Sequence, residues 1–350
     1  MKKLAVGVLG ATGMVGQRFI QGLEDHPYFD LVCLAASERS AGKKYREAAK
    51  WHIEGGIPES VADQRVDLLD PGLVEEYDLD LVFSSIPASV AKDVEASFAS
   101  RVPTFSNTRT YRMEDDVPLI VADVNPDHLS LVEKQRERGW DGFVVTNPNC
   151  STIGLVVPLK PLLDVFGIDW VNVTTLQGLS GAGYNGVPSM AVIDNIIPYI
   201  GGEEEKMESE SLKILGSLGD KVDCSDIQVT ASCNRVPVLD GHTEAVSVGL
   251  SRDFEVEEVV NAFKDYENEP QRLGLPSAPC PAILVHEEPD RPQPRRDRLA
   301  GCGMAVSCGR IMRKAERLLR FYALSHNTIR GAAGASILNA ELAYKKGFLG

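Results

Sequence analysis

The chain of 350 residues lacks the features that would assign it to several broad classes of protein. No uninterrupted apolar run approaches the roughly 18 residues of a membrane-spanning helix, so a membrane protein is not expected. Basic residues do not predominate, because 36 Lys and Arg against 50 Asp and Glu give a formal net charge of −14. Nucleic acid phosphates require a basic surface, so a nucleic-acid partner is not expected, although a locally basic pocket for a small anion is still allowed.

Cysteine and histidine are too scattered to suggest disulfides or a metal site. The seven cysteines are odd in number and include no Cys-x-x-Cys pair, which is typical of reduced thiols in a reducing compartment. The six histidines do not cluster with them at zinc-ligand spacing. The short apolar stretch after the first two lysines runs directly into glycines, unlike a signal peptide. We therefore predict a globular cytoplasmic protein without a bound metal.

The first 25 residues indicate a strand, a glycine-rich turn and a helix. Apolar residues precede Gly10, Gly13 and Gly16, although Val8 replaces the first glycine of the usual G-x-G-x-x-G motif. Such a turn directs the N–H groups of a helix N-terminus toward a phosphate. Further apolar segments follow among helix-like ones, and we predict strands at residues 30–37, 79–87, 117–125 and 142–149. This alternation favours an α/β fold with a doubly wound parallel sheet of the Rossmann type.

The residues after the second predicted strand indicate which dinucleotide binds. An NAD site usually has Asp or Glu at this position to hold the ribose 2′-hydroxyl. Here the strand is followed by Ser37, Arg39 and Ser40, whose hydroxyls and guanidinium suit the 2′-phosphate of NADP. Glu38 leaves NAD as an alternative, and a solvated charged loop without a ligand is a third interpretation.

A cysteine stands out in TNPNCSTIGL, residues 146–155. Asn149 is a favourable N-cap residue, so we predict a helix after it that Pro158 and Pro161 make short or kinked. A thiolate in the first helical turn is stabilised by the helix dipole and by unpaired N–H groups. Cys150 is therefore a candidate nucleophile, whereas a buried core thiol, as predicted for Cys33, is the alternative.

A cysteine nucleophile needs a proton acceptor, and two histidines are favourably placed. His242 follows a turn and immediately precedes an alternating strand, and His326 is the other candidate. Arg235 ends a predicted strand shortly before His242, and its guanidinium would suit a carboxylate or phosphate. An exposed turn histidine beside an unrelated arginine is the alternative. The remaining histidines lie in loop-like settings and are expected at the surface: His26, His52, His128 and His286.

In order along the chain, the motifs resemble those of the aspartate-β-semialdehyde dehydrogenase family, in its archaeal and fungal branch. The resemblance runs essentially end to end and rests on GATGMVGQRF, ASERSAGKKY, SNTRTYRMEDDVPL, NPNCST, LQGLSGAGYNGVPSM, EEEKMESESLKILG, NRVPVLDGHTEAV and LSHNTIRGAAGASILNAEL. It implies an NADP-binding Rossmann domain over residues 1–149, completed by a helix over 327–350. Residues 150–326 would form an α+β catalytic and dimerisation domain, in a layout similar to that of glyceraldehyde-3-phosphate dehydrogenase.

The resemblance also implies a reaction and an assembly. The reaction is the NADPH-dependent reductive dephosphorylation of β-aspartyl phosphate to aspartate semialdehyde, with release of inorganic phosphate. It proceeds through a cysteine thioester and serves lysine, threonine, methionine and isoleucine biosynthesis. The assembly would be a homodimer or homotetramer.

Individual residues acquire expected roles from the same resemblance. Cys150 matches the nucleophile, His242 the acid/base, and Gln177 the glutamine that orients the intermediate. Substrate contacts are implied for Arg235 at the α-carboxylate, Glu210 and Lys213 at the amino group and phosphate, and Arg112 at the phosphate, with Arg109 as an alternative. Besides Gly10, Ser37, Arg39 and Ser40, cofactor contacts are implied for Thr12, Gly13, Met14, Val15, Ser180, Gly181 and Asn327.

Two other functions are compatible with parts of this pattern. A malonyl-CoA reductase of the same family would keep the nucleophile, the base and Arg235, but it would not need Glu210 or Lys213. A catalytically silent NADP-binding protein would not need Cys150, Gln177, Arg235 and His242 together. The basic segment 312–321 is not explained by the resemblance, and we predict a helix-like solvated connector there.

Overall fold

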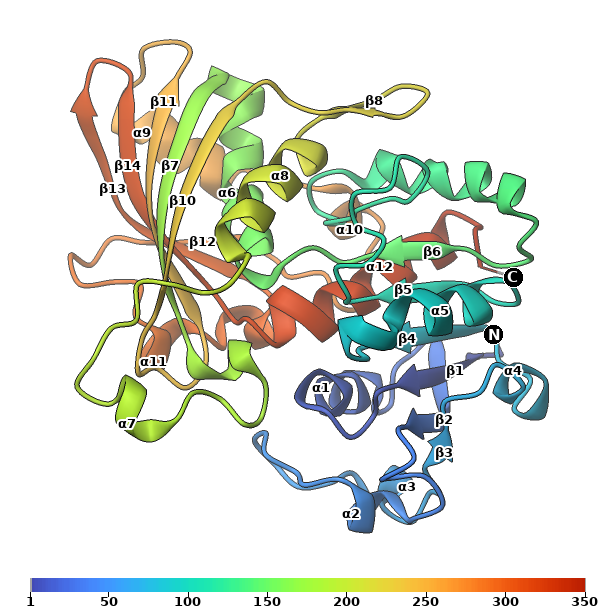
Figure 1. Cartoon of the computed structure of the whole chain (residues 1–350). Coiled ribbons are helices and arrows are strands. Elements are labelled where there is room, and N and C mark those ends of the chain that lie inside the picture. The colour runs from blue at the N-terminus through green and yellow to red at the C-terminus, as the bar shows by residue number, and fades with distance from the viewer. Residues whose placement is uncertain (1, 350) are drawn as a thin grey trace. The chain divides into compact units, whose positions relative to one another are not determined.

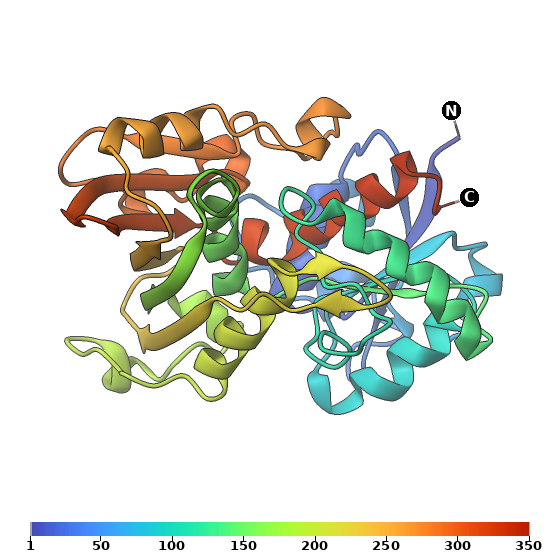
Figure 2. The same ribbon diagram turned by 90° about the horizontal axis from the view of Figure 1, so that it is seen from above.

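The computed structural model describes residues 2–349 and divides the chain into two compact units (Figures 1 and 2). The first unit contains Met1–Ile120, Asp127–Pro148 and Ala332–Gly350, and the second contains Val121–Pro126 and Asn149–Gly331. The C-terminal residues therefore belong to the same unit as the N-terminal strand.

A six-stranded sheet in which every neighbouring pair is parallel forms the centre of the first unit. In sheet order its strands are β3 (Asp67–Leu68), β2 (Phe29–Ala36), β1 (Leu4–Leu9), β4 (Leu81–Ser84), β5 (Thr104–Ser106) and β6 (Val144–Thr146). This is the order of two mononucleotide-binding halves that meet between β1 and β4. The predicted Rossmann fold is confirmed.

Helices cover both faces of this sheet. On one face lie α1 (Met14–Leu23) and α12 (Gly334–Lys345), where Phe19 stacks on Phe83 with ring centroids 4.9 Å apart. On the other lies α5 (Ala88–Ala99), whose Phe98 packs in one cluster with Val82. Because both faces are buried, the central strands are continuous apolar runs without alternation. The remaining helices of this region are α2 (Tyr45–Ala48), α3 (Glu59–Ala62), α4 (Leu73–Glu76) and η1 (Pro126–Arg138).

Two predictions for this unit are wrong in detail. Residues 117–125 are buried coil, because Pro118 lacks an N–H for a sheet ladder; here Leu119 forms an isolated bridge with Thr146. The fifth strand is instead the three-residue β5, which is too short to show periodicity. The C-terminal helix does not begin at Asn327, whose side chain is bound to other loops; a π-helical turn, η4 (Ile329–Ala333), precedes α12.

The second unit has an α+β architecture, as predicted. Its mixed six-stranded sheet consists, in order, of β10 (Gln228–Arg235), β7 (Ile168–Gln177), β11 (His242–Leu250), β14 (Leu318–Ser325), β13 (Val306–Ala315) and β12 (Ile283–His286). The helices packed against it are α6 (Cys150–Phe166), α8 (Glu203–Ile214) and α9 (Val256–Lys264). The remaining elements are η2 (Leu179–Ala182), α7 (Ser189–Val192), β8 (Ser217–Leu218), β9 (Val222–Asp223), α10 (Glu269–Arg272), α11 (Pro294–Asp297) and η3 (Ala300–Gly303).

The helix after Cys150 is not short, because α6 extends for 17 residues and includes Pro158 and Pro161. A proline inside a helix costs about 3 kcal/mol. Each fully buried Leu or Val contributes roughly 1.5–3 kcal/mol, and α6 buries several completely, among them Leu155, Val156 and Leu159. Packing of this helix therefore outweighs its two prolines.

The basic segment 312–321 is part of the β13–β14 hairpin, not a helix. Leu319 and Phe321 are fully buried, whereas Arg313 forms an ion pair with Asp253 at 2.7 Å. The period of two between buried and outward side chains is that of a strand, and the charged residues concealed it.

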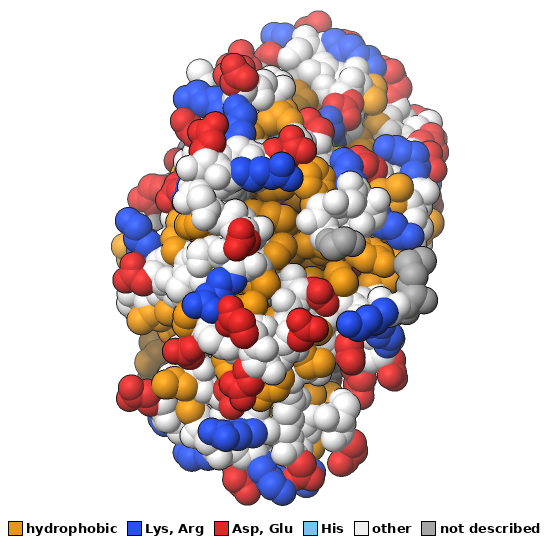
Figure 3. All heavy atoms as spheres, turned by 90° about the vertical axis from the view of Figure 1, so that its right-hand side faces the viewer, with side chains coloured by type: hydrophobic (Ala, Val, Ile, Leu, Met, Phe, Trp, Pro, Cys, Tyr) orange, Lys and Arg blue, Asp and Glu red, His pale blue; other side chains and the backbone are white. Residues whose placement is uncertain are grey.

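On the face drawn in Figure 3, basic and acidic side chains are interspersed, and the side chains coloured there form no continuous basic patch. Among residues 2–349, no helix has the length and apolar character needed to cross a membrane.

Candidate active site

Neighbouring strands of the second sheet bring three of the predicted site residues into one row. Arg235 ends β10 and is paired with Gln177, which ends β7. Gln177 is in turn paired with His242, the first residue of β11, and His242 with Ser325 of β14. Directly paired residues project from the same face of a sheet, so these side chains lie side by side.

Cys150 meets this row from the N-terminus of α6. The side chain of Asn149 caps the helix, since its Oδ1 accepts from the N–H groups of Ser151 and Thr152 at 2.9 and 3.2 Å. The Cys150 Sγ lies 3.3 Å from Nε2 of His242. The predicted nucleophile and base are therefore in contact.

The tautomer of His242 follows from its other nitrogen. Nδ1 accepts a hydrogen bond from the N–H of Gly178 at 3.0 Å, so the neutral ring carries its proton on Nε2, toward the sulfur. Burial, assisted by the charge of Arg235, lowers the pKa of His242 to about 4. At neutral pH the ring is uncharged and its Nε2–H favours the thiolate form of Cys150.

Gly178 also orients Arg235. Its carbonyl accepts from Nη1 of Arg235 at 2.6 Å, while its N–H holds His242, so one peptide segment fixes both side chains. Gly181 lies against the same pair. A Cβ there would be 2.8 Å from Nη1 of Arg235 and 3.2 Å from the His242 ring, so only glycine fits without displacement.

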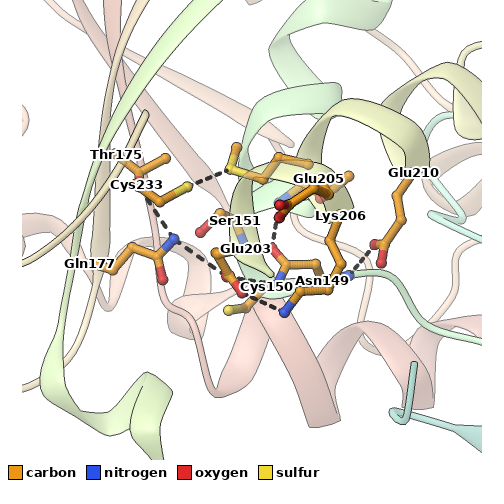
Figure 4. Close-up of polar contacts among 12 residues, drawn as sticks. Asn149, Cys150, Ser151, Thr175, Gln177, Glu203, Glu205, Lys206, Glu210 and Cys233 are labelled. Atoms are coloured by element: carbon orange, nitrogen blue, oxygen red, sulfur yellow. Dashed lines mark hydrogen bonds and ion pairs between the residues drawn. The ribbon is translucent and has the colours of Figure 1, made fainter. Parts of the chain in front are cut away.

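Helix α8 carries both residues predicted to contact the substrate amino group and phosphate, Glu210 (Figure 4) and Lys213. Oε2 of Glu210 accepts from the N–H of Asn149 at 2.6 Å, and Lys213 is buried one turn further along. Gln177 donates through Nε2 to Oγ1 of Thr175 at 3.2 Å and to Oε1 of Glu203 at 3.3 Å. Glu210, Lys213 and Gln177 thus belong to the same unit as Cys150.

Glu203 is a residue that the sequence did not reveal. It begins α8, is 6% exposed, and accepts hydrogen bonds from Asn149 and Lys206 as well as from Gln177. In the sequence it opens the run EEEK, which is typical of a solvated helix start. The available signal was its spacing of seven from Glu210, which places both carboxylates on one helix face.

The predicted cofactor residues of the first unit lie at the carboxyl ends of β1 and β2. Gly10 has φ +84°, and a Cβ on it would be 2.9 Å from the carbonyl oxygen of Ser85. Thr12 and Gly13 complete the turn, and α1 begins with Met14 and Val15. Beyond β2, Ser37 and Arg39 are exposed and Ser40 is buried. In open α/β sheets, ligands bind at this edge of the strands.

The predicted cofactor residues of the second unit surround His242. Asn327 accepts from the N–H of Gly241 and donates to Oγ of Ser180, both at 2.8 Å. Gly181 follows Ser180. Arg112, in contrast, belongs to the first unit, where it is buried and donates to the carbonyl of Asn107 at 3.0 Å. Its contact with a substrate phosphate stays a prediction.

Two histidines expected at the surface are buried. His26 is 5% exposed, stacks on Phe29, and has Nε2 2.9 Å from Glu341 of α12, so it helps to anchor the C-terminal helix. His128 is 1% exposed. Their polar neighbours in the sequence hid this burial. Among residues 2–349, no group of three or more His, Cys, Asp or Glu side chains is arranged to hold a metal ion.

Glu244 lies two residues after His242 on the same face of β11 and is completely buried. Within the described residues neither of its carboxyl oxygens has a hydrogen-bond partner, and burial raises its pKa well above the ordinary value. Burial therefore favours the protonated, uncharged form of this carboxyl group.

Glu244→Gln is expected to flatten the pH dependence of stability. Above pH 4.3 or so the unfolded chain ionises this group and the native chain does not, so native stability falls by about 1.4 kcal/mol per pH unit until the native pKa is reached. Denaturant unfolding between pH 5 and 8 measures the free energy of unfolding of both proteins. As the pH rises, that of the native protein should fall relative to that of the variant. If the free energies of unfolding of the two proteins changed with pH in parallel, the assignment would be contradicted. Glu205→Gln, at an exposed position, is the control and should run parallel to the native protein.

The first unit has a sheet of the dinucleotide-binding type, and the second has a cysteine–histidine pair suited to covalent catalysis, as expected of a nicotinamide-dependent oxidoreductase. Family models agree: one described as semialdehyde dehydrogenase, NAD binding domain, matches residues 5–132, and one described as semialdehyde dehydrogenase, dimerisation domain, matches residues 159–330.

Individual relatives give the family. Aspartate-semialdehyde dehydrogenase of Methanothermobacter thermautotrophicus is 55% identical over 341 residues, covering 96% of this chain and 98% of that protein. The Schizosaccharomyces pombe protein of the same name is 48% identical, covering 98% and 99%. A crystal structure of the Candida albicans enzyme with NADP is 45% identical, with a TM-score of 0.90 and coverage of 99% and 100%. The chain belongs to the aspartate-semialdehyde dehydrogenase family.

Proposed function

We propose that the protein catalyses the NADPH-dependent reductive dephosphorylation of β-aspartyl phosphate to aspartate semialdehyde, and the reverse reaction. The observation that carries the proposal is the 3.3 Å contact between Cys150 Sγ and His242 Nε2, in a row with Gln177 and Arg235. The names of the archaeal and fungal relatives support the same reaction.

The chemistry uses the thiolate as nucleophile. The sulfur of Cys150 attacks the acyl carbon, the bond from that carbon to the phosphate oxygen breaks, and inorganic phosphate leaves a thioester. NADPH, when bound, supplies a hydride. His242, with its proton on Nε2, donates a hydrogen bond to the sulfur and then to the alkoxide oxygen of the thiohemiacetal, and so stabilises the negative charge at each stage. Breakage of the C–S bond releases the aldehyde and restores the thiolate.

Residues of the first unit fit a dinucleotide. The positive φ of Gly10 and its close approach to Ser85 make a tight turn, and Gly13 has no side chain to cap the following N–H groups of α1. A pyrophosphate suits these groups. Ser37, Arg39 and Ser40 would hold the 2′-phosphate that distinguishes NADP from NAD.

Arg39→Ala is expected to raise the Michaelis constant for NADP about 10-fold or more and to change that for NAD little. The reason is the loss of a charge-assisted hydrogen bond to the 2′-phosphate, which NAD lacks. Steady-state kinetics with both cofactors give the comparison, with Arg101→Ala, at an exposed site of the same unit, as control. An equal effect on both cofactors would remove Arg39 from 2′-phosphate recognition.

The substrate residues favour aspartyl phosphate over a CoA ester. Arg235 would hold the α-carboxylate, Glu210 the amino group, and Lys213 with Arg112 the phosphate. Malonyl-CoA has a distal carboxylate but neither an amino group nor a transferable phosphoryl group, so Glu210 and Lys213 would have no ligand. The amino group and the phosphoryl group of β-aspartyl phosphate would give both residues a ligand, which supports the amino-acid substrate.

A substrate comparison tests the proposal. We expect turnover with aspartate semialdehyde, NADP and inorganic phosphate, dependent on phosphate, and none with malonyl-CoA and NADPH. Turnover with the CoA ester alone would make the protein an acyl-CoA reductase. Turnover with neither, in folded protein that binds NADPH, would favour a silent binding protein.

We further propose a cytoplasmic homodimer or homotetramer. The second unit matches a model described as a dimerisation domain and exposes large apolar side chains, notably Met190, Ile193 and Tyr199. Exposed apolar patches of this kind mark protein interfaces. Light scattering coupled to gel filtration measures the mass, and a monomer at assay concentration would contradict the proposal.

A further inference from the structure

Glu203 is a buried carboxylate that accepts hydrogen bonds from three side chains, of which Asn149 precedes the nucleophile and Gln177 is paired with His242. Nδ2 of Asn149 donates at 2.7 Å, Nε2 of Gln177 at 3.3 Å and Nζ of Lys206 at 2.6 Å. In Figure 4 these side chains converge on it from α6, β7 and α8. Three separate elements thus share one anionic acceptor.

Glu203 is ionised at neutral pH. Burial alone would raise its pKa, but the charge of Lys206 and the hydrogen bonds from Lys206 and Asn149 hold the pKa below its ordinary value. A buried charge with these partners is held in one place, because moving it would leave it unpaired.

A carboxylate can only accept hydrogen bonds, so it determines how the two amides face. For Asn149 the NH2 group must face Glu203, which leaves Oδ1 for the first N–H groups of α6. For Gln177 both hydrogens of Nε2 are used, one by Glu203 and one by Thr175, so its carbonyl oxygen is left to face a ligand. If either amide were flipped, its carbonyl oxygen would face the carboxylate oxygen of Glu203 and the two would repel each other.

We infer that Glu203 is a positioning residue for the proposed reaction: it holds Asn149 and Gln177 in the orientations that cap the helix of Cys150 and present the carbonyl of Gln177. The inference rests on the proposed function for the role of Gln177, but the effect on Cys150 does not. Glu203 acts through these amides and does not itself meet the reacting atoms.

Glu203→Gln tests this role. It preserves the size of the side chain but places an NH2 group opposite the NH2 groups of Asn149 and Gln177. We expect kcat for aspartate semialdehyde oxidation to fall about 10- to 100-fold, as for loss of hydrogen bonds to a charged group, with Michaelis constants changed less than about 3-fold. Glu205→Gln, on the same helix but exposed, is the matched control and should keep native kinetics. A Glu203→Gln variant within about 2-fold of this control would overturn the inference.

A double-mutant cycle separates positioning from general damage. If Glu203 acts through Gln177, then Glu203→Gln should cost much less in a Gln177→Ala background than in the native chain; additive losses would also overturn the inference. Should Glu203→Gln fail to fold, Glu203→Asp keeps the charge and withdraws the oxygen from the amides. It should lose kcat similarly, and native kinetics in it would contradict the role.

A readout without substrate distinguishes the two proposals. The rate at which iodoacetamide alkylates Cys150, followed by peptide mass spectrometry, should fall in Glu203→Gln and not in Glu205→Gln. If native protein fails to turn over aspartate semialdehyde while this difference persists, the proposed substrate is wrong and the positioning role stands. If the native protein turns over aspartate semialdehyde, and both alkylation and kcat are unchanged in Glu203→Gln, the positioning role is wrong and the proposed function stands.

Discussion

Cys150→Ala is expected to reduce turnover of aspartate semialdehyde by about 10⁴-fold or more, because no thioester can form without the sulfur. The loss should fall on kcat. NADPH affinity should change little, since Cys150 is not among the residues expected to hold the dinucleotide. Half-burial of Cys150 also limits any loss of stability.

Steady-state rates, NADPH fluorescence titration and thermal unfolding measure these three quantities. Cys224→Ala is the matched control, because Cys224 is an exposed thiol of the same unit and should be dispensable. Retention of more than about 1% of native kcat in Cys150→Ala would exclude a covalent mechanism through this residue.

His242→Asn is the second large effect, and we expect kcat to fall about 10²- to 10⁴-fold, since the loss of a donor to a developing oxyanion typically costs about 10²- to 10³-fold and the thiolate loses the same donor. Asn can still accept from the N–H of Gly178 but does not place a ring N–H on the sulfur. Cys150 alkylation should slow in parallel, because the thiolate loses its hydrogen-bond donor. A variant with normal alkylation and near-normal kcat would contradict the assignment.

The pH profile of the native enzyme gives a separate check on His242. Burial first, and then the charge of Arg235, lower its pKa to about 4 in the free protein. The backbone of Gly241 and the charge of Glu203 raise the pKa by less. The acid limb of kcat/KM should therefore lie well below pH 6.5. A substrate carboxylate on Arg235 would offset that charge and raise the pKa, so the acid limb of kcat should lie at higher pH.

Features with strong local signals were predictable from the sequence. The turn around Gly10 and Gly13 and the alternation of apolar segments gave the Rossmann fold, because a tight turn and a buried parallel strand leave direct marks in residue type. Cys150 and His242 each stand next to a turn at the start of an element, which made them recognisable. Their 3.3 Å contact depends on how α6 packs against β11, and only the resemblance to a family linked the two residues in advance.

Features that depend on tertiary packing were not predictable. Glu203 reads as one of several solvated glutamates until α8 is placed against α6 and β7. Helix α6 continues through two prolines only because its apolar side chains are buried on most sides. The charged residues of 312–321 suggested a helix. They lie instead on the outward face of the β13–β14 hairpin, where Arg313 forms an ion pair with Asp253.

Trapping the acyl enzyme tests the central claim most directly. The protein is mixed with β-aspartyl phosphate without NADPH, quenched in acid, digested and analysed by peptide mass spectrometry. The account predicts an aspartyl thioester on the peptide that contains Cys150, which hydroxylamine removes and which NADPH, added before the quench, converts to free aspartate semialdehyde. An adduct on a different cysteine, or no adduct in protein that turns over, would contradict it.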